Sequence, residues 1–193
     1  MARNGGMRHR AFTVIEMLIT LAVAAVAASL ALPAFSRMVN QHVSAAAANQ
    51  LVGAVALARS EAILRRSTVT MCPGAHGHCL GRDQWHLGTL VFLDGNGNGQ
   101  VDDDDRVVRA LPALRPGARV YWRSFRNRSY LQFQPRGYTQ WQNGTLLYCP
   151  PEGRLDLARL VILNAGGRTR PGVDSDGDGI VNRPGGDNVR CPP

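Results

Sequence analysis

The chain has 193 residues, of which 45% are hydrophobic. This is enough for one domain with its own core and an extension, and it excludes a chain that is disordered throughout. All 22 basic residues are arginines, against 14 acidic residues, and the net charge of +8 indicates an anionic partner.

A nearly continuous apolar run covers residues 12–35 and is long enough for one membrane-spanning helix. Glu16 is its only charged residue, and three arginines precede it with no acidic residue among them. The positive-inside rule therefore predicts that residues 1–11 stay in the cytoplasm. The rest of the chain would lie on the outer side of the membrane, which it crosses once.

A cleavable secretory signal would share this basic start and apolar run. A carboxylate in the apolar core costs roughly 2.5 to 3.5 kcal/mol, however, so Glu16 needs a functional reason that a signal peptide does not offer. The helical spacing also continues past the run. We therefore expect one helix from Phe12 to about Arg66, kinked or loosened at Pro33, whose amphipathic second half lies on a sheet. Its apolar stripe consists of Phe35, Val39, Val43, Ala47, Leu51, Val55, Ala58 and Ala62.

The segment from Ala11 to Glu16 resembles the prepilin signature of type IV pilin-like proteins. In that family a prepilin peptidase and N-methyltransferase cuts before a phenylalanine and methylates the new N-terminus, so the resemblance implies cleavage between Ala11 and Phe12. It also implies that Glu16 neutralises the N-terminal amine of a neighbouring subunit during filament assembly. In a pilin-like protein the membrane is the inner membrane, and its outer side is the periplasmic side. Ala11 stands where the family usually has glycine, and alanine is still small enough for a tight peptidase site.

After Arg66 the helical period gives way to short β-rich runs separated by turn residues. This order predicts an α+β fold with a long helix packed on an antiparallel sheet, which is the type IV pilin fold that the resemblance implies. The expected parts are a leader (1–11), a transmembrane helix (12–35), its amphipathic continuation (36–66) and a β-rich head with a disulfide-tethered tail (67–193). Strands are expected near Val69–Met71, Thr89–Leu93, Arg106–Leu111, Arg119–Trp122, Tyr130–Gln134, Thr145–Cys149 and Arg159–Leu163.

The four cysteines all lie beyond the apolar run, where an exported head meets an oxidising compartment, so disulfides are expected. Four cysteines allow three pairings. The short spacing favours Cys72 with Cys79, which leaves Cys149 to tie down the tail through Cys191. The alternative is a zinc site formed by the first two cysteines and the two histidines between them, but four ligands within eight residues are cramped for a tetrahedral metal.

Two acidic loops carry oxygen atoms that could bind calcium. Residues 94–105 match a calcium loop at several positions, but asparagine and glycine are also the commonest hairpin residues, and the flanking apolar runs favour a hairpin. Residues 174–182 have the higher acid count. This segment is either a calcium-binding loop or a flexible tail loop without metal. No other cofactor is expected. The calcium ligands would be Asp174, Asp176, Asp178 and Asn182.

No nucleophile with a matched base, no phosphate-binding loop and no pair of catalytic carboxylates is evident, so an enzyme is not expected. The main remaining signal is charge, because residues 106–170 contain twelve arginines and two acidic residues. Aromatic residues interleave with these arginines. Such a pattern is compatible with phosphate contacts and base stacking, and equally with a sheet whose aromatics face the core while its arginines face water.

Arg159 begins a predicted strand that runs into Gly167, Arg168 and Arg170. In an extended chain residues two apart point to the same side, so Arg168 and Arg170 would present guanidinium groups ~6.6 Å apart along the backbone. Glycine lets the main chain come close to a ligand. A Gly-Arg-x-Arg motif after a late strand resembles the GspH/FimT family of minor pilins and pseudopilins. In the FimT-like branch this motif contributes to DNA capture in natural transformation, so the resemblance implies DNA binding at these residues.

The predicted function is therefore a FimT-like minor pilin near the tip of a type IV pilus. Its partners would be other pilin subunits, the prepilin peptidase, the inner membrane and DNA. The alternative is a protein H-like pseudopilin of a type II secretion system with a structural role at the pseudopilus tip, and a calcium-binding anchored domain is a third interpretation. The positive charge of the head favours DNA, since a purely structural subunit does not need it.

Overall fold

The computed structural model describes residues 13–126 and 128–192, and the predicted cleavage site at Ala11 and Phe12 lies outside them. The chain divides into two compact units with a boundary between residues 40 and 41. In the first unit every described residue up to 39 is exposed, and helix α1 (Val14–Arg65) continues without interruption through Pro33. By length and composition, α1 is able to cross a membrane.

In the second unit α1 supplies one wall of the core. Its buried residues are mostly alanines, and small side chains let strands approach a helix closely. The predicted stripe is buried from Ala47 onward, whereas Phe35 and Val39 belong to the first unit and are exposed. Ser44 and Ala54 also face the core, although the predicted stripe omits them. The buried residues of α1 are Ser44, Ala47, Leu51, Ala54, Val55, Ala58 and Ala62.

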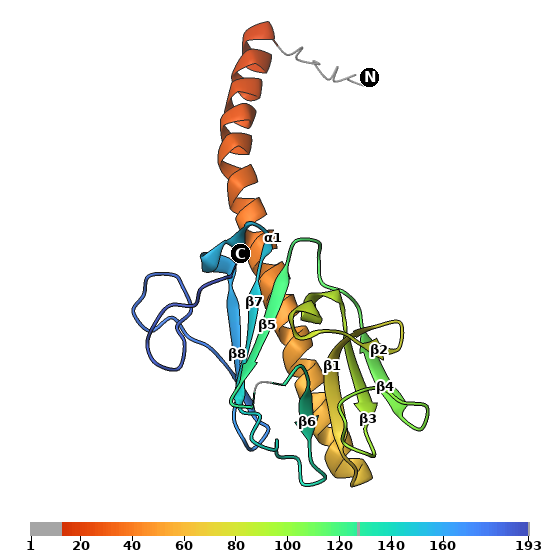
Figure 1. Ribbon diagram of the computed structural model, residues 1–193. Helices are drawn as coiled ribbons and strands as arrows, with labels where there is room; N and C mark the ends of the chain where they lie inside the picture. The colour runs from red at the N-terminus through yellow and green to blue at the C-terminus, as the bar shows by residue number, and fades with distance from the viewer. Residues whose placement is uncertain (1–12, 127, 193) are drawn as a thin grey trace, which may run out of the picture. The chain divides into compact units, whose positions relative to one another are not determined.

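Two antiparallel sheets lie side by side along this part of α1 (Figure 1). The first has the order β2-β1-β3-β4, and β6 also pairs with β1. It consists of β1 (Val69–Ala75), β2 (His78–Cys79), β3 (Thr89–Leu93), β4 (Arg106–Leu111) and β6 (Leu131–Phe133). The second has the order β5-β7-β8-β9. It consists of β5 (Arg119–Ser124), β7 (Gly144–Cys149), β8 (Arg159–Leu163) and β9 (Thr169–Pro171). Three short 3-10 helices, η1 (Arg82–Leu87), η2 (Pro151–Gly153) and η3 (Leu155–Leu157), connect the strands.

The predicted α+β fold is therefore confirmed. Each of the seven predicted strands is present, and the differences are short pieces that periodicity does not reveal. The structure adds β2, which has two residues, and the edge strand β9, which has three, and it extends β1 to Ala75. Strand β9 ends at Pro171, a residue that a sheet tolerates at its edge.

Strand alternation gives the second sheet two different faces. In β8, Val161 and Leu163 face α1 in the main core. Leu160 belongs to a second cluster on the opposite face, together with Leu147 and Val189. Because Val189 lies in the C-terminal tail, this tail covers part of the outer face of the second sheet. In Figure 1 the tail loops out beside β8 and returns to the sheet.

Two disulfides have the pairing that the spacing predicts. Cys72–Cys79 joins β1 to β2, and Cys149–Cys191 joins β7 to the tail, with sulfur–sulfur distances of 2.05 and 2.00 Å. The sulfur atoms of Cys72 and Cys79 are thus bonded to each other, which removes both from the alternative zinc site.

The first acidic loop is the connection of the antiparallel pair β3–β4, as the hairpin interpretation predicts. Asp94 is fully buried at its start. Its Oδ2 accepts hydrogen bonds from Thr70 Oγ1 (2.6 Å), Gln132 Nε2 (3.0 Å) and the backbone N–H of Gly99 (3.0 Å). A buried carboxylate needs such partners, and here they fasten the hairpin to β1 and β6.

Candidate functional site

The predicted Gly-Arg-x-Arg motif forms the turn between β8 and β9 and the start of β9. The turn is closed by hydrogen bonds from the N–H of Asn164 to the carbonyl of Arg168 (3.0 Å) and from the N–H of Arg168 to Asn164 Oδ1 (2.9 Å). The motif was predicted to follow the last strand, but its second arginine lies inside the additional strand β9. Arg170 stands opposite Ile162 of β8.

Gly167 has a packing role in this turn. It is buried and adopts φ +74°. A Cβ atom at this position would lie 2.5 Å from the carbonyl oxygen of Gly137 and 3.1 Å from Cδ of Arg59. Arg59 Nε in turn donates a hydrogen bond to the same carbonyl (2.9 Å). Gly167 therefore lets the turn sit against α1 and the loop that carries Gly137.

The candidate DNA-binding arginines differ in exposure and in the cavity that they line. Arg168 and Arg170 are exposed, whereas Arg159 is half-buried and its Nη1 donates to the carbonyl of Ala158 (2.9 Å). Arg159 and Arg170 line one cavity of about 400 Å³ that also borders α1 and the tail. Arg168 is not among the residues that line it. The sequence thus placed the two motif arginines correctly at the surface, but it did not predict that Arg170 and Arg159 line one cavity.

The tail loop brings together three of its four predicted calcium ligands. The carboxylate oxygens of Asp174, Asp176 and Asp178 lie within 4.8 Å of one another. Hydrogen bonds from the N–H groups of Gly179 and then Gly177 lower the pKa of Asp174. The fourth residue is engaged elsewhere, because Asn182 Oδ1 accepts from the N–H of Ser175 (2.6 Å) and is buried. The calcium interpretation remains a prediction for the three carboxylates alone.

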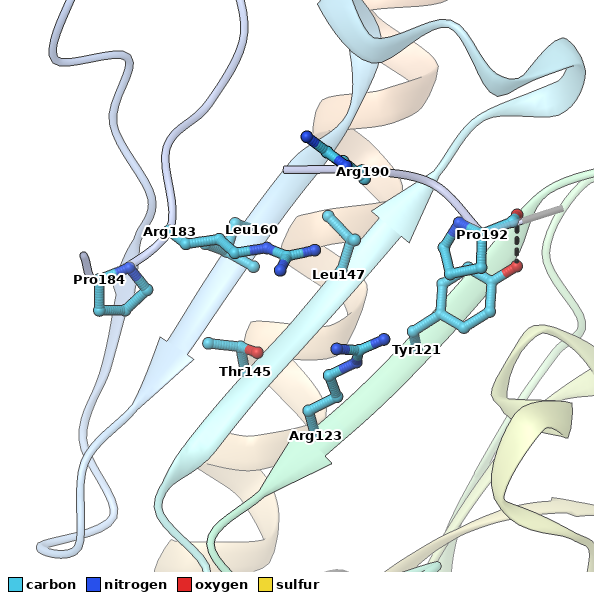
Figure 2. Close-up of a pocket in the computed structure, with 9 residues that line it drawn as sticks. All are labelled: Tyr121, Arg123, Thr145, Leu147, Leu160, Arg183, Pro184, Arg190 and Pro192. Atoms are coloured by element: carbon cyan, nitrogen blue, oxygen red, sulfur yellow. Dashed lines mark hydrogen bonds between the residues drawn. The ribbon is translucent and has the colours of Figure 1, made fainter. Parts of the chain in front are cut away.

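A second group of arginines, which the sequence did not reveal, lies on the outer face of the second sheet (Figure 2). Arg123 extends from β5, and Arg183 and Arg190 extend from the tail. All three side chains line one small pocket, together with Tyr121, Thr145, Leu147, Leu160, Pro184 and Pro192. The alternation of Tyr121 and Arg123 along β5 could have indicated their shared face. The predicted disulfide Cys149–Cys191 indicates where the end of the tail with Arg190 lies, but the path that brings Arg183 to the same face has no such signal.

The exposed arginines of the motif and of the pocket are not neutralised by ion pairs within the described residues. Within residues 13–126 and 128–192, no side-chain carboxylate forms an ion pair with any of the exposed arginines of the motif or of the pocket. The ion pairs that the structure shows join Arg65 to Glu61 and Arg154 to Asp156. These surfaces can therefore offer guanidinium groups to an anion without first breaking an internal ion pair.

Comparisons with known proteins agree with this architecture. Residues 47–167 match the family model of the type II transport protein GspH, and residues 6–32 match that of the prokaryotic N-terminal methylation motif. The first match ends at Gly167, so Arg168, Arg170 and the tail lie beyond it. No curated protein sequence matches the chain.

Two solved structures have a similar fold, and both are crystal forms of the type IV minor pilin FimU of Pseudomonas aeruginosa. The form in space group P21 has 18% identity and a TM-score of 0.52, and covers 70% of this chain and 90% of its own. The form in space group P65 has 19% identity and a TM-score of 0.51, and covers 65% and 90%. Because the GspH model matches more than half of the chain and the fold is that of a type IV pilin, the chain belongs to the GspH/FimT family of membrane-anchored, pilin-like proteins and is a minor pilin or pseudopilin.

Proposed function

We propose that the protein is a minor pilin of a type IV pilus and that it binds DNA during natural transformation. The observation that carries the DNA part is a set of exposed arginines around the second sheet that have no ion-pair partner in the described part of the chain: Arg123, Arg168, Arg170, Arg183 and Arg190. Guanidinium groups bind phosphate oxygens in pairs of parallel hydrogen bonds, so such a surface suits the DNA backbone. The half-buried Arg159 would support the site from β8.

In the pilin part of this proposal, the peptidase cuts between Ala11 and Phe12, and residues 12–35 hold the protein in the inner membrane. The head then lies in the periplasm and later near the pilus tip. The apolar character of α1 and the match to the methylation motif support this arrangement. N-terminal mass spectrometry of the protein from membranes tests it, and an N-terminus elsewhere than Phe12 would contradict it.

The DNA-binding test compares two double variants of the full chain purified in detergent. Arg168→Gln with Arg170→Gln removes two motif charges. Arg106→Gln with Arg109→Gln removes two exposed charges from β4 in the other sheet and serves as the control. Charged hydrogen bonds contribute about 1.5 to 3 kcal/mol each, so the motif variant should weaken DNA binding by at least about tenfold. It should also lower the slope of log K against log salt by about two units, because two fewer counterions are released.

The wild-type affinity should fall steeply as salt rises and should not depend on DNA sequence. An equal loss in the motif variant and the control variant would mean that a diffuse field, not the motif, attracts the DNA. Absence of DNA binding by the wild-type chain at low salt would refute the DNA function.

A type II secretion pseudopilin is the second candidate, and the description of the matching family model favours it. This role needs assembly with other pseudopilins and no DNA contact. Crosslinking in cells followed by identification of the neighbours separates the two candidates. Type IV pilins as neighbours support the first, and pseudopilins of the secretion system support the second.

A further inference from the structure

The pocket between the second sheet and the tail is lined by three arginine residues. Its volume is about 90 Å³. Figure 2 shows the side chains of Arg123 and Arg183 over the strands, and Arg190 above them with its side chain directed away from the other two, so that Arg190 lines the upper edge of the pocket. Like charges that line one pocket repel one another, and a bound anion offsets this repulsion because it attracts each of them.

The floor of this pocket is apolar and rigid. Leu147 and Leu160 are buried members of the cluster beneath it. On one side, the hydroxyl of Tyr121 donates a hydrogen bond to the carbonyl of Pro192 (3.1 Å) and fixes the end of the tail. An apolar floor holds little water, which strengthens the attraction between a guanidinium group and an anion above it.

The carboxylates on the other side of the tail arginines do not pair with them among the described residues. Arg183 and Arg190 also border a polar cleft that contains Asp176 and Asp187. Neither carboxylate forms an ion pair with these arginines among the described residues. The N–H of Arg183 donates to the carbonyl of Asp187 (2.7 Å), which is a backbone contact and leaves the guanidinium group available.

Size and chemistry together select the class of ligand. Pockets for whole small molecules usually measure about 300 to 1,000 Å³, so a pocket of about 90 Å³ admits a single group. A tetrahedral oxyanion offers several acceptors to three guanidinium groups, each of which favours bidentate contacts. We propose that Arg123, Arg183 and Arg190 form a binding pocket for one phosphate group. If the proposed DNA function holds, this phosphate belongs to the DNA backbone, and that part of the inference rests on the proposed function.

The disulfide Cys149–Cys191 makes this pocket dependent on the oxidised state. Cys191 follows Arg190 directly and ties it to β7. Without this bond the last residues of the tail lose their covalent link to the sheet, and the tail arginines are held over it only by non-covalent contacts such as those of Val189 and Pro192. The pocket should therefore assemble only after export to an oxidising compartment.

The test uses the full chain in detergent, with pyrophosphate as the probe in a calorimetric titration at low salt. Wild-type protein should bind it. Arg183→Gln with Arg190→Gln should bind at least about tenfold more weakly, while the β4 control (Arg106→Gln with Arg109→Gln) should bind like wild type. Replacing Cys149 and Cys191 by serine should weaken binding as well, whereas replacing Cys72 and Cys79 by serine should not.

No pyrophosphate binding by the wild type, or equal binding by the tail variant and the wild type, would overturn the pocket. A circular dichroism spectrum of each variant serves to check that it is folded. DNA provides the second arm, because loss of this single phosphate contact should lower the salt slope of DNA binding by about one unit. Pyrophosphate binding without any DNA binding would refute the proposed function and leave the pocket as a site for a free phosphate or another phosphate ester. DNA binding that depends on Arg168 and Arg170, without pyrophosphate binding, would refute the pocket and support the proposed function.

Discussion

Gly167 shows how one residue of a predicted binding motif can be required by the fold. Its φ of +74° and the nearby carbonyl of Gly137 leave no room for a side chain. Replacing Gly167 by alanine should lower the free energy of unfolding by about 1 to 3 kcal/mol, because a left-handed backbone and a close contact are both penalised. Gly166 is the control, since its nearest neighbour for an added Cβ is Asn164 Oδ1 at 3.4 Å.

Urea unfolding of the two alanine variants measures this difference. If Gly167→Ala is as stable as Gly166→Ala but loses DNA binding, the glycine serves the ligand and the packing role is wrong. If it is less stable and binds DNA normally when folded, the motif consists of its arginines alone.

His86 links stability to pH. Burial, and then the charge of Arg119 that contacts its ring, lower the pKa of His86 below the ordinary value of 6.5. The folded protein therefore stays neutral at His86 while the unfolded chain takes up a proton, so stability falls as the pH drops through about 6.5. Unfolding midpoints at pH 7.5 and 5.5 should show this fall in the wild type. His86→Gln should reduce it, and replacement of the exposed His78 should not.

At the scale of elements, the sequence predicts what depends on local pattern. The short apolar runs TLVFL and RLVIL identify β3 and β8, and the spacing of Leu51, Val55, Ala58 and Ala62 identifies the buried face of α1. It does not predict β9, whose three residues show no period. It also misses the phosphate pocket, because a tail without regular structure brings Arg183 and Arg190 to the sheet. That path depends on Cys149–Cys191 and on the contacts of Val189, which are long-range.

The two disulfides should differ in their contribution to stability. The sequence separation is 42 residues for Cys149–Cys191 and 7 for Cys72–Cys79. In the chain-entropy model the stabilisation grows as 1.5RT times the logarithm of the loop length, so the longer loop gains about 1.6 kcal/mol more. Denaturant unfolding of the two double serine variants measures this difference. A larger loss for the Cys72–Cys79 variant would show that strand packing around β1, rather than loop entropy, sets the order.

On the scale of the whole molecule, the two units divide the tasks of a pilin. All side chains of residues 13–39 are exposed, so this described part of the first unit has no core of its own and depends on lipid or on neighbouring subunits for burial. The second unit has its own core, both disulfides and every candidate anion site. We therefore expect assembly to depend on the first unit and ligand binding on the second, so that variants affect one without the other.

Glu16 provides the test of this division. It lies in the first turn of α1, and its side chain is exposed within an apolar segment. Replacing it by glutamine removes a charge that costs roughly 2.5 to 3.5 kcal/mol in hydrocarbon, so membrane insertion should be kept or improved. Incorporation into filaments should fall sharply, because the N-terminal amine of a neighbouring subunit loses its partner. DNA and pyrophosphate binding by the purified variant should not change. Glu61→Gln, which removes a charge from the second unit, is the matched control. Immunoblots of sheared filaments measure the incorporated protein, and immunoblots of membranes measure the inserted protein. Wild-type levels of Glu16→Gln in the filaments would show that this carboxylate has no role in assembly.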